Sequence, residues 1–264
     1  MGVLNLTPDS FSDGGDFLDP EQALQRAIQI EREGADILDL GAESTRPGAQ
    51  PVSTEEEIAR LLPVLKLIRT KVTLPISIDT TKPEVARECL EAGADIINDV
   101  SGLKRSGVEM AKAVGKFEAG LVLMHSRGTP ETMQTQAVYR DVVAEVMSEL
   151  RESIQLAVDA GLEREQLVID PGLGFAKTTD QNLEIMRQLS VFHEIGLPVM
   201  LGPSRKSFVG QVTGRETNER EFGTAACVAS AVMQGVQILR VHDVKAMRDV
   251  IRVMESIKKL KPAA

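Results

Sequence analysis

The stretch PISIDTTKPEVARECLEAGADIIND, residues 75–99, decides the fold because it holds one complete strand, helix and strand unit. Its two ends, PISID at 75–79 and DIIND at 95–99, are short apolar runs of the kind that form buried strands. The residues between them have the spacing of an amphipathic helix. A strand, a covering helix and a second strand predict two parallel strands joined by a crossover.

The same alternation continues in both directions to the ends of the 264-residue chain. The other strand-like runs are GVLNL (2–6), DILDL (36–40), LVLMH (121–125), LVIDP (167–171), PVMLG (198–202) and QILRV (237–241). Eight strands that alternate with helices predict an α/β fold, a single (β/α)8 TIM barrel domain covering residues 1–264. An open doubly wound sheet usually has fewer strands and a glycine-rich first turn, which this chain lacks.

Local signals predict where helices begin and where one of them should be disturbed. Asp19 before Pro20 predicts a helix N-cap followed by a proline in the first turn. Ser53 and Glu56 have the spacing of a capping box. Pro63 lies inside the helical pattern that follows, so we expect it to kink or interrupt that helix.

Composition limits the classes of partner. A net charge of -9 argues against a nucleic-acid or anionic-membrane surface, since both need a broad basic face. The sequence shows no apolar run of membrane-spanning length and no signal-peptide pattern, so we expect a cytoplasmic protein. Cys89 and Cys227 lie far apart without CxxC spacing, which favours a packing role over metal or redox chemistry.

Polar residues lie at the carboxyl ends of the predicted strands, where a barrel fold places its active site. They are Asn5, Asp39, Asp79, Asn98, Asp99, His125, Asp170, Arg240 and His242, together with GPSRKSF (202–208) after the seventh strand. Any one of them could instead cap the following helix. Together, these carboxylates, amides and cations favour a site that reads a flat polar ring and holds a multiply charged anion.

Eight blocks of sequence resemble the dihydropteroate synthase family of the bacterial folate pathway, in the family's order. They are GVLNLTPDSFSDGG, DLGAESTRPGA, SIDTTKPEV, IINDVSG, LMHSRGTPETMQ, IDPGLGFAKT, GPSRKSF and ILRVHDV. The resemblance implies a (β/α)8 barrel and a transferase. Its reaction joins 6-hydroxymethyl-7,8-dihydropterin diphosphate to p-aminobenzoate and gives 7,8-dihydropteroate and diphosphate. It also implies Mg2+ as cofactor, a homodimer and inhibition by sulfonamides.

The resemblance further implies a role for each matching residue. Pterin binding falls to Asp79, Asn98, Met124, Asp170, Phe175 and Lys206; catalysis to Lys206, Asp170, Asp79 and Arg240. The residues implied to bind diphosphate are Asn5, Thr45, Arg46, Arg240 and His242, and Asn5 is also implied to hold Mg2+. The residues implied to bind p-aminobenzoate are Phe11, Arg46, Pro47, Phe175 and Ser207. These residue types suit the chemistry, because a carboxylate accepts from the amino group and ring N–H of a pterin while an ammonium donates to its carbonyl.

Two alternative functions stay open at this point. A corrinoid-linked methyltransferase would share the pterin-binding barrel, but it should lack the diphosphate-handling segments TPDSFSDGG and STRPG, which this chain has. The presence of Asn5, Arg46 and Lys206 argues against a pterin-binding protein that has lost catalysis. An assay of diphosphate release separates these alternatives.

Overall fold

The computed structural model describes residues 1–7, 19–44 and 49–259. Four residues predicted to bind diphosphate or p-aminobenzoate lie outside these ranges: Phe11, Thr45, Arg46 and Pro47. All eight predicted strand runs fall within them, so the barrel prediction can be compared with the structure directly.

Each of the eight predicted runs contains a strand, and all observed pairings are parallel. Six strands form one sheet in chain order: β1 (Gly2–Asn5), β2 (Leu38–Gly41), β3 (Ile76–Asp79), β4 (Ile96–Asp99), β5 (Gly120–Met124) and β6 (Leu167–Asp170). The last two strands, β7 (Met200–Leu201) and β8 (Ile238–Leu239), pair with each other.

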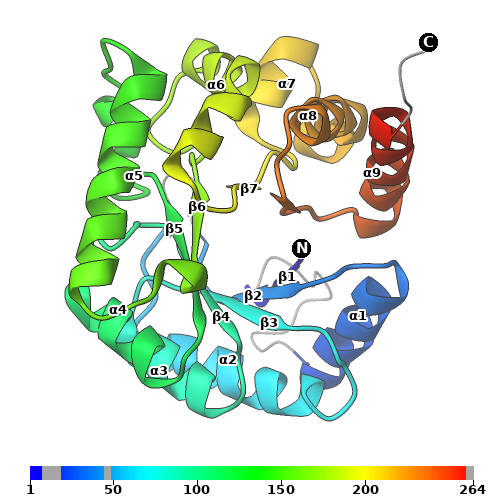
Figure 1. The fold of residues 1–264 in the computed structure, drawn as a ribbon. Helices are drawn as coiled ribbons and strands as arrows, with labels where there is room; N and C mark the ends of the chain where they lie inside the picture. Colours follow the sequence, from blue (N-terminus) through cyan, green and yellow to red (C-terminus); the bar gives the residue numbers. More distant parts are fainter. Residues whose placement is uncertain (8–18, 45–48, 260–264) are drawn as a thin grey trace.

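Two isolated parallel bridges join these sheets into a ring. Ile169 of β6 pairs with Val199 beside β7, and Gly2 of β1 pairs with Val241 just after β8. The Val3 N–H also donates to the Val241 carbonyl at 3.0 Å. The predicted TIM barrel is therefore confirmed, and Figure 1 shows its strands on the inside of an outer layer of helices.

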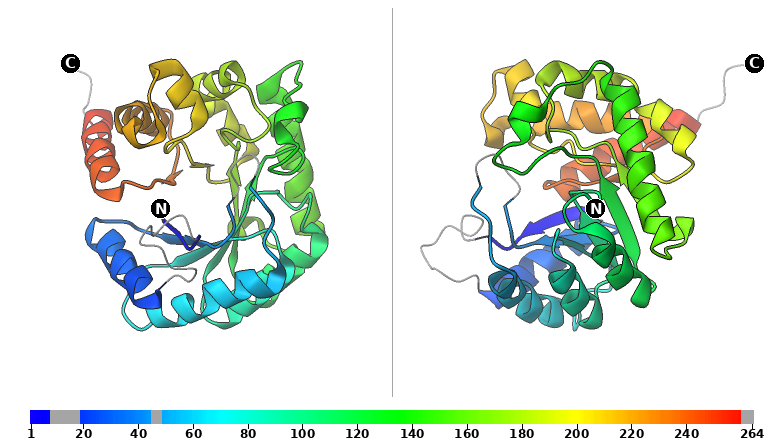
Figure 2. Two further views of the ribbon diagram at one scale, coloured as in Figure 1. Left: turned by 180° about the vertical axis from the view of Figure 1, so that it is seen from behind. Right: turned by 90° about the vertical axis from the view of Figure 1, so that its left-hand side faces the viewer.

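The helices that cover the strands follow them in chain order (Figure 2). They are α1 (Pro20–Arg32), α2 (Thr54–Ile68), α3 (Pro83–Glu91), α4 (Gly107–Lys116), α5 (Val142–Asp159), α6 (Thr179–Arg187), α7 (Ser207–Thr213), α8 (Glu221–Met233) and α9 (Val244–Lys259). Asp19 accepts from the Glu21 N–H at 3.0 Å and Ser53 accepts from the Glu56 N–H at 3.2 Å, so both residues are N-caps. The Ser53 bond is one of the two bonds of the predicted capping box.

Pro63 does not interrupt its helix, because α2 runs from Thr54 to Ile68 with the proline inside it. A proline there cannot donate one backbone hydrogen bond and crowds the preceding turn. The same helix buries Leu61, Val64 and Leu65 against the barrel. This packing outweighs the local cost, so the prediction of an interruption was wrong.

The core lies between the strands and the helices, and it fixes the outer surface of the barrel. Leu40, Ile78 and Ile97 are fully buried on neighbouring strands, and Cys89 is buried beside them while Cys227 is partly buried. Both cysteines are free thiols, and the burial of Cys89 agrees with the packing role predicted for it. Among the helices of the described residues, none combines the length and the apolar character needed to cross a membrane.

Candidate active site

An ion-pair cluster fills the inside of the barrel near the carboxyl ends of β2, β3 and β8. Arg240, the residue after β8, donates from Nε to Asp39 Oδ2 at 2.7 Å and from Nη2 to Asp79 Oδ2 at 2.8 Å. Asp39 is fully buried within β2, and Asp79 is buried at the end of β3. Arg240 therefore binds two carboxylates that lie 201 and 161 positions before it in the sequence.

Burial and the paired charges act in opposite directions on the pKa values of this cluster. It raises the pKa of Asp79 to about 7, although the Arg240 guanidinium opposes the shift. Burial acts to lower the pKa of Arg240, but Asp39 and Asp79 together raise it above its ordinary value. Arg240 is therefore a permanent cation between two carboxylates, one of which titrates near neutral pH.

Asn98, Met124 and Asp170 lie at or beside the ends of β4, β5 and β6, and all three are buried. The Oδ1 atom of Asn98 is buried without a hydrogen-bond partner among the described residues. Asp170 accepts one bond, from the Gly172 N–H to Oδ1 at 2.7 Å, and burial raises its pKa. Because buried polar atoms are normally paired, the unpartnered Asn98 oxygen indicates a ligand position.

Lys206 lies opposite these groups, at the residue that precedes α7. Its ammonium lies 4.3 Å from the centroid of the Phe175 ring, a cation–π contact. A side chain at Gly174 would approach Lys206 Cδ to 3.2 Å, so the glycine leaves room for the lysine. Burial and the charge of Arg240 lower the pKa of Lys206 to about 8, although Asp170 and Asp79 oppose this.

The described parts of the chain hold three more predicted site residues, which follow β8, end β1 and begin α7. His242 bonds through Nδ1 to Ser204 Oγ at 2.9 Å, and burial and Arg240 lower its pKa to about 4. It is therefore a neutral hydrogen-bonding group at pH 7, and positive charge comes from Lys206 and Arg240. Asn5 ends β1 and is partly exposed, while Ser207 begins α7 and is exposed.

Sequence reasoning gave Asp39 no binding role, although the structure makes it the principal partner of Arg240. The available signal was a carboxylate in the middle of an otherwise apolar strand, which needs a buried partner. Which cation would pair with it could not be read from the chain. No group of three or more His, Cys, Asp and Glu residues placed to hold a metal ion is present among the described residues.

The site thus combines two functions at the rim of the barrel. Asn98 and Asp170 offer buried oxygen acceptors and Lys206 offers a donor, which suits a flat ring with alternating donors and acceptors. Arg240 and Lys206 supply positive charge for an anion, even though the whole chain carries a net charge of -9.

Comparison with known proteins agrees with this class of barrel enzyme: the model of the pterin-binding enzyme family matches residues 1–242. The dihydropteroate synthase of Escherichia coli K12 is 45% identical over 97% of this chain and 90% of its own length. The Yersinia pestis enzyme, solved with a sulfonamide drug, has a TM-score of 0.93 and 39% identity over 98% of this chain and 94% of that one. The Xanthomonas albilineans enzyme, solved with 7,8-dihydropteroate, has a TM-score of 0.88 and 39% identity over 98% and 93%. This chain therefore belongs to the pterin-binding enzymes and, within them, to the dihydropteroate synthase family.

Proposed function

We propose that this chain condenses 6-hydroxymethyl-7,8-dihydropterin diphosphate with p-aminobenzoate, giving 7,8-dihydropteroate and diphosphate in folate synthesis. One observation carries the proposal: the buried, unpartnered Oδ1 of Asn98 lies at the same rim as Asp170 and Lys206. A relative of 39% identity has been solved with 7,8-dihydropteroate, the product of this reaction.

The pterin ring is the substrate part that these side chains suit best. Asp170 accepts from the ring N–H and the exocyclic amino group, Asn98 pairs with the ring edge, and Lys206 donates to the ring carbonyl. The side chain of Phe175 lies under the Lys206 ammonium and offers an apolar face. Rings that lack this pattern are rejected, because they would leave buried groups unpaired.

The reaction breaks the bond between the pterin methylene and the diphosphate oxygen while the aryl amine attacks that carbon. Negative charge then builds on the departing diphosphate, and positive charge from Arg240 and Lys206 stabilises it. His242, neutral at pH 7, contributes hydrogen bonding to the diphosphate. The amine is neutral at this pH, so no strong general base is needed.

The metal assignment rests on the chemistry of one side chain. The Asn5 amide oxygen is a hard ligand at the carboxyl end of β1, is partly exposed, and has no hydrogen bond to another described residue. Asn5 therefore fits a role in holding Mg2+ together with diphosphate oxygens and water. When bound, the ion would neutralise charge on the leaving group.

The direct test measures diphosphate release with both substrates and Mg2+ present. We expect release to require p-aminobenzoate and to match the 7,8-dihydropteroate formed. Pterin binding without release would instead favour a non-catalytic pterin-binding protein. Methyl transfer from a methylated folate to a corrinoid, without diphosphate release, would favour the methyltransferase alternative.

Sulfonamides are expected to inhibit this enzyme in competition with p-aminobenzoate. A sulfonamide presents an aryl amine opposite an acidic sulfonyl group, so it reproduces both ends of the substrate. We propose that the anionic end of either molecule lies near Ser207, and that substitutions at Phe11 or Pro47 weaken the drug more than the substrate. The check is steady-state kinetics with sulfamethoxazole: an unchanged apparent KM for p-aminobenzoate would contradict the assignment.

We further propose that the chain forms a homodimer through α8 and α9, which pack against each other. Phe222 and Met233 on α8 and Val253 and Ile257 on α9 are exposed, and Phe222 is 87% exposed. Several large exposed apolar side chains on two helices that pack together favour an association surface, whereas a single exposed one does not. Phe222→Asp should shift the sedimentation coefficient toward that of a monomer, whereas Val108→Asp on α4 should not; a wild-type monomer would contradict the proposal.

A cytoplasmic location, the absence of a nucleic-acid partner and the domain limits of 1–264 stay predictions.

A further inference from the structure

A buried lysine, Lys177, lies behind the pterin side of the site, in the loop between β6 and α6. Its Nζ atom is 3.0 Å from each of three acceptors: the Gly172 carbonyl, the Phe175 carbonyl and Nδ1 of His125. An ammonium has three donors and no acceptor, so this geometry satisfies it completely. Burial lowers the pKa of Lys177 to about 7, although the negative charges of Asp170 and Glu149 oppose that shift.

The contact to Lys177 fixes the tautomer of His125. When Lys177 is protonated, its ammonium can only donate, so Nδ1 accepts and the ring proton lies on Nε2. Nε2 in turn lies 3.1 Å from Glu149 Oε2, to which it can donate. Burial and the charge of Lys177 lower the pKa of His125 to about 3, so the ring stays neutral.

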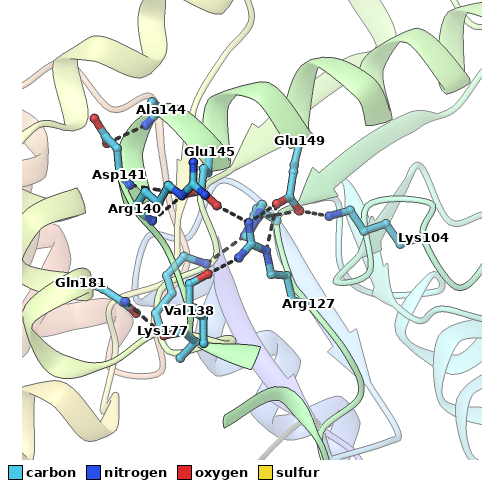
Figure 3. A network of polar contacts seen from close by, with 12 residues as sticks. Lys104, Arg127, Val138, Arg140, Asp141, Ala144, Glu145, Glu149, Lys177 and Gln181 are labelled. Carbon is cyan, nitrogen blue, oxygen red and sulfur yellow. Dashed lines mark hydrogen bonds and ion pairs between the residues drawn. The ribbon is translucent and has the colours of Figure 1, made fainter. Parts of the chain in front are cut away.

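Glu149, on α5, anchors the outer end of this chain of contacts. The Nε atom of Arg127 donates to Glu149 Oε1 at 2.9 Å, and Lys104 forms a second ion pair with it. Although burial opposes this, bonds from His125, Arg127 and Lys104 hold the pKa of Glu149 well below its ordinary value. Figure 3 shows Glu149 between Arg127 and Lys104, with Lys177 reaching toward the same cluster.

At the Lys177 end of this series of contacts, the ammonium binds the loop that carries the predicted pterin contacts. Lys177 binds the carbonyl of Gly172, whose N–H donates to Asp170, and the carbonyl of Phe175, whose ring lies against Lys206. One ammonium therefore restrains the backbone beside the pterin acceptor and the backbone beside the pterin donor. Among the described residues, the Lys177 side chain forms no hydrogen bond with the side chain of Asp170 or Lys206.

We propose that Lys177, held by His125 and Glu149, is a positioning residue that sets the Gly172–Phe175 backbone so that Asp170 and Lys206 meet the pterin ring together. The inference rests on the proposed function of this site. It predicts that losing Lys177 weakens pterin binding although every pterin-contacting side chain remains.

The experiment compares Lys177→Met, His125→Leu and His125→Asn with the wild-type chain. Asn keeps an acceptor near the position of His Nδ1, whereas Leu keeps bulk but no acceptor. We expect Lys177→Met and His125→Leu to lower kcat/KM for the pterin diphosphate about 10- to 100-fold, with His125→Asn retaining most of it. Calorimetric titration with the pterin should rank the variants in the same order by affinity as kcat/KM does. The binding stoichiometry should stay unchanged, because it reports the folded fraction of each variant.

Lys112→Met is the matched control, because Lys112 lies on the exposed face of α4 and pairs there with Glu109. It should leave both kcat/KM and affinity unchanged. Equal pterin affinity in wild type, Lys177→Met and His125→Leu would overturn the inference, as would equal losses in His125→Leu and His125→Asn. If Lys177→Met does not fold, the two His125 variants decide. A wild-type chain that forms no dihydropteroate would instead contradict the proposed function.

Discussion

Lys206→Ala is expected to lower kcat/KM for the pterin diphosphate by about 30- to 1000-fold, or roughly 2–4 kcal/mol of transition-state stabilisation. The variant removes the donor to the pterin carbonyl and one of two cations near the departing diphosphate. We expect the variant to fold, because the Lys206 ammonium lies over the Phe175 ring. It forms no ion pair within hydrogen-bond distance among the described residues. Steady-state kinetics with both substrates gives the measurement.

The pH profile adds a second signature of Lys206. Because the pKa of Lys206 is lowered to about 8, its ammonium is lost as the pH rises through that value, and kcat/KM should fall above it. Lys206→Arg keeps its charge, so it should lack this alkaline limb whatever its absolute rate. A Lys206→Ala enzyme of near wild-type activity would show that other groups bind the pterin.

Gly172→Ala should destabilise the chain by about 3 kcal/mol or more and abolish turnover. Gly172 has a φ of 72°, and a Cβ there would lie 1.9 Å from the His125 carbonyl oxygen. Backbone must therefore move beside Asp170, whose carboxylate accepts the Gly172 N–H. Urea unfolding measures the stability, and the activity assay measures the second effect.

Gly214→Ala is the matched control for this prediction. Gly214 has a φ of 68°, yet a Cβ there would meet nothing within 4 Å. Its substitution carries only the conformational cost of a positive φ, about 1 kcal/mol. Equal destabilisation of the two variants would show that backbone conformation, rather than the clash with His125, limits position 172.

The barrel could be predicted because its signal is local and repeated. Each strand is a short apolar run and each helix has its own periodicity, so eight runs suffice to give the element order. Strand limits were less certain: the run at 198–202 contains a strand of only two residues, Met200–Leu201. Pro63 shows the opposite failure, where a strong local signal was outweighed by packing of α2 against the barrel.

The rim residues were predictable for the same topological reason, but their pairing was not. The carboxyl ends of parallel strands must meet, so Asp79, Asn98 and Asp170 were expected together. The sequence does not show that Arg240 pairs with Asp39, or that Lys177 forms a hydrogen bond with His125. Those contacts depend on where the folded chain places each side chain, which the sequence pattern does not specify.

A crystal structure of this chain with 7,8-dihydropteroate tests the pterin assignment most directly. We expect the pterin amino group and ring N–H to donate to the Asp170 carboxylate, with Asn98 at the ring edge and Lys206 donating to the ring carbonyl. A pterin bound elsewhere, for example in the groove lined by Arg26, Glu33 and Asp249, would contradict it.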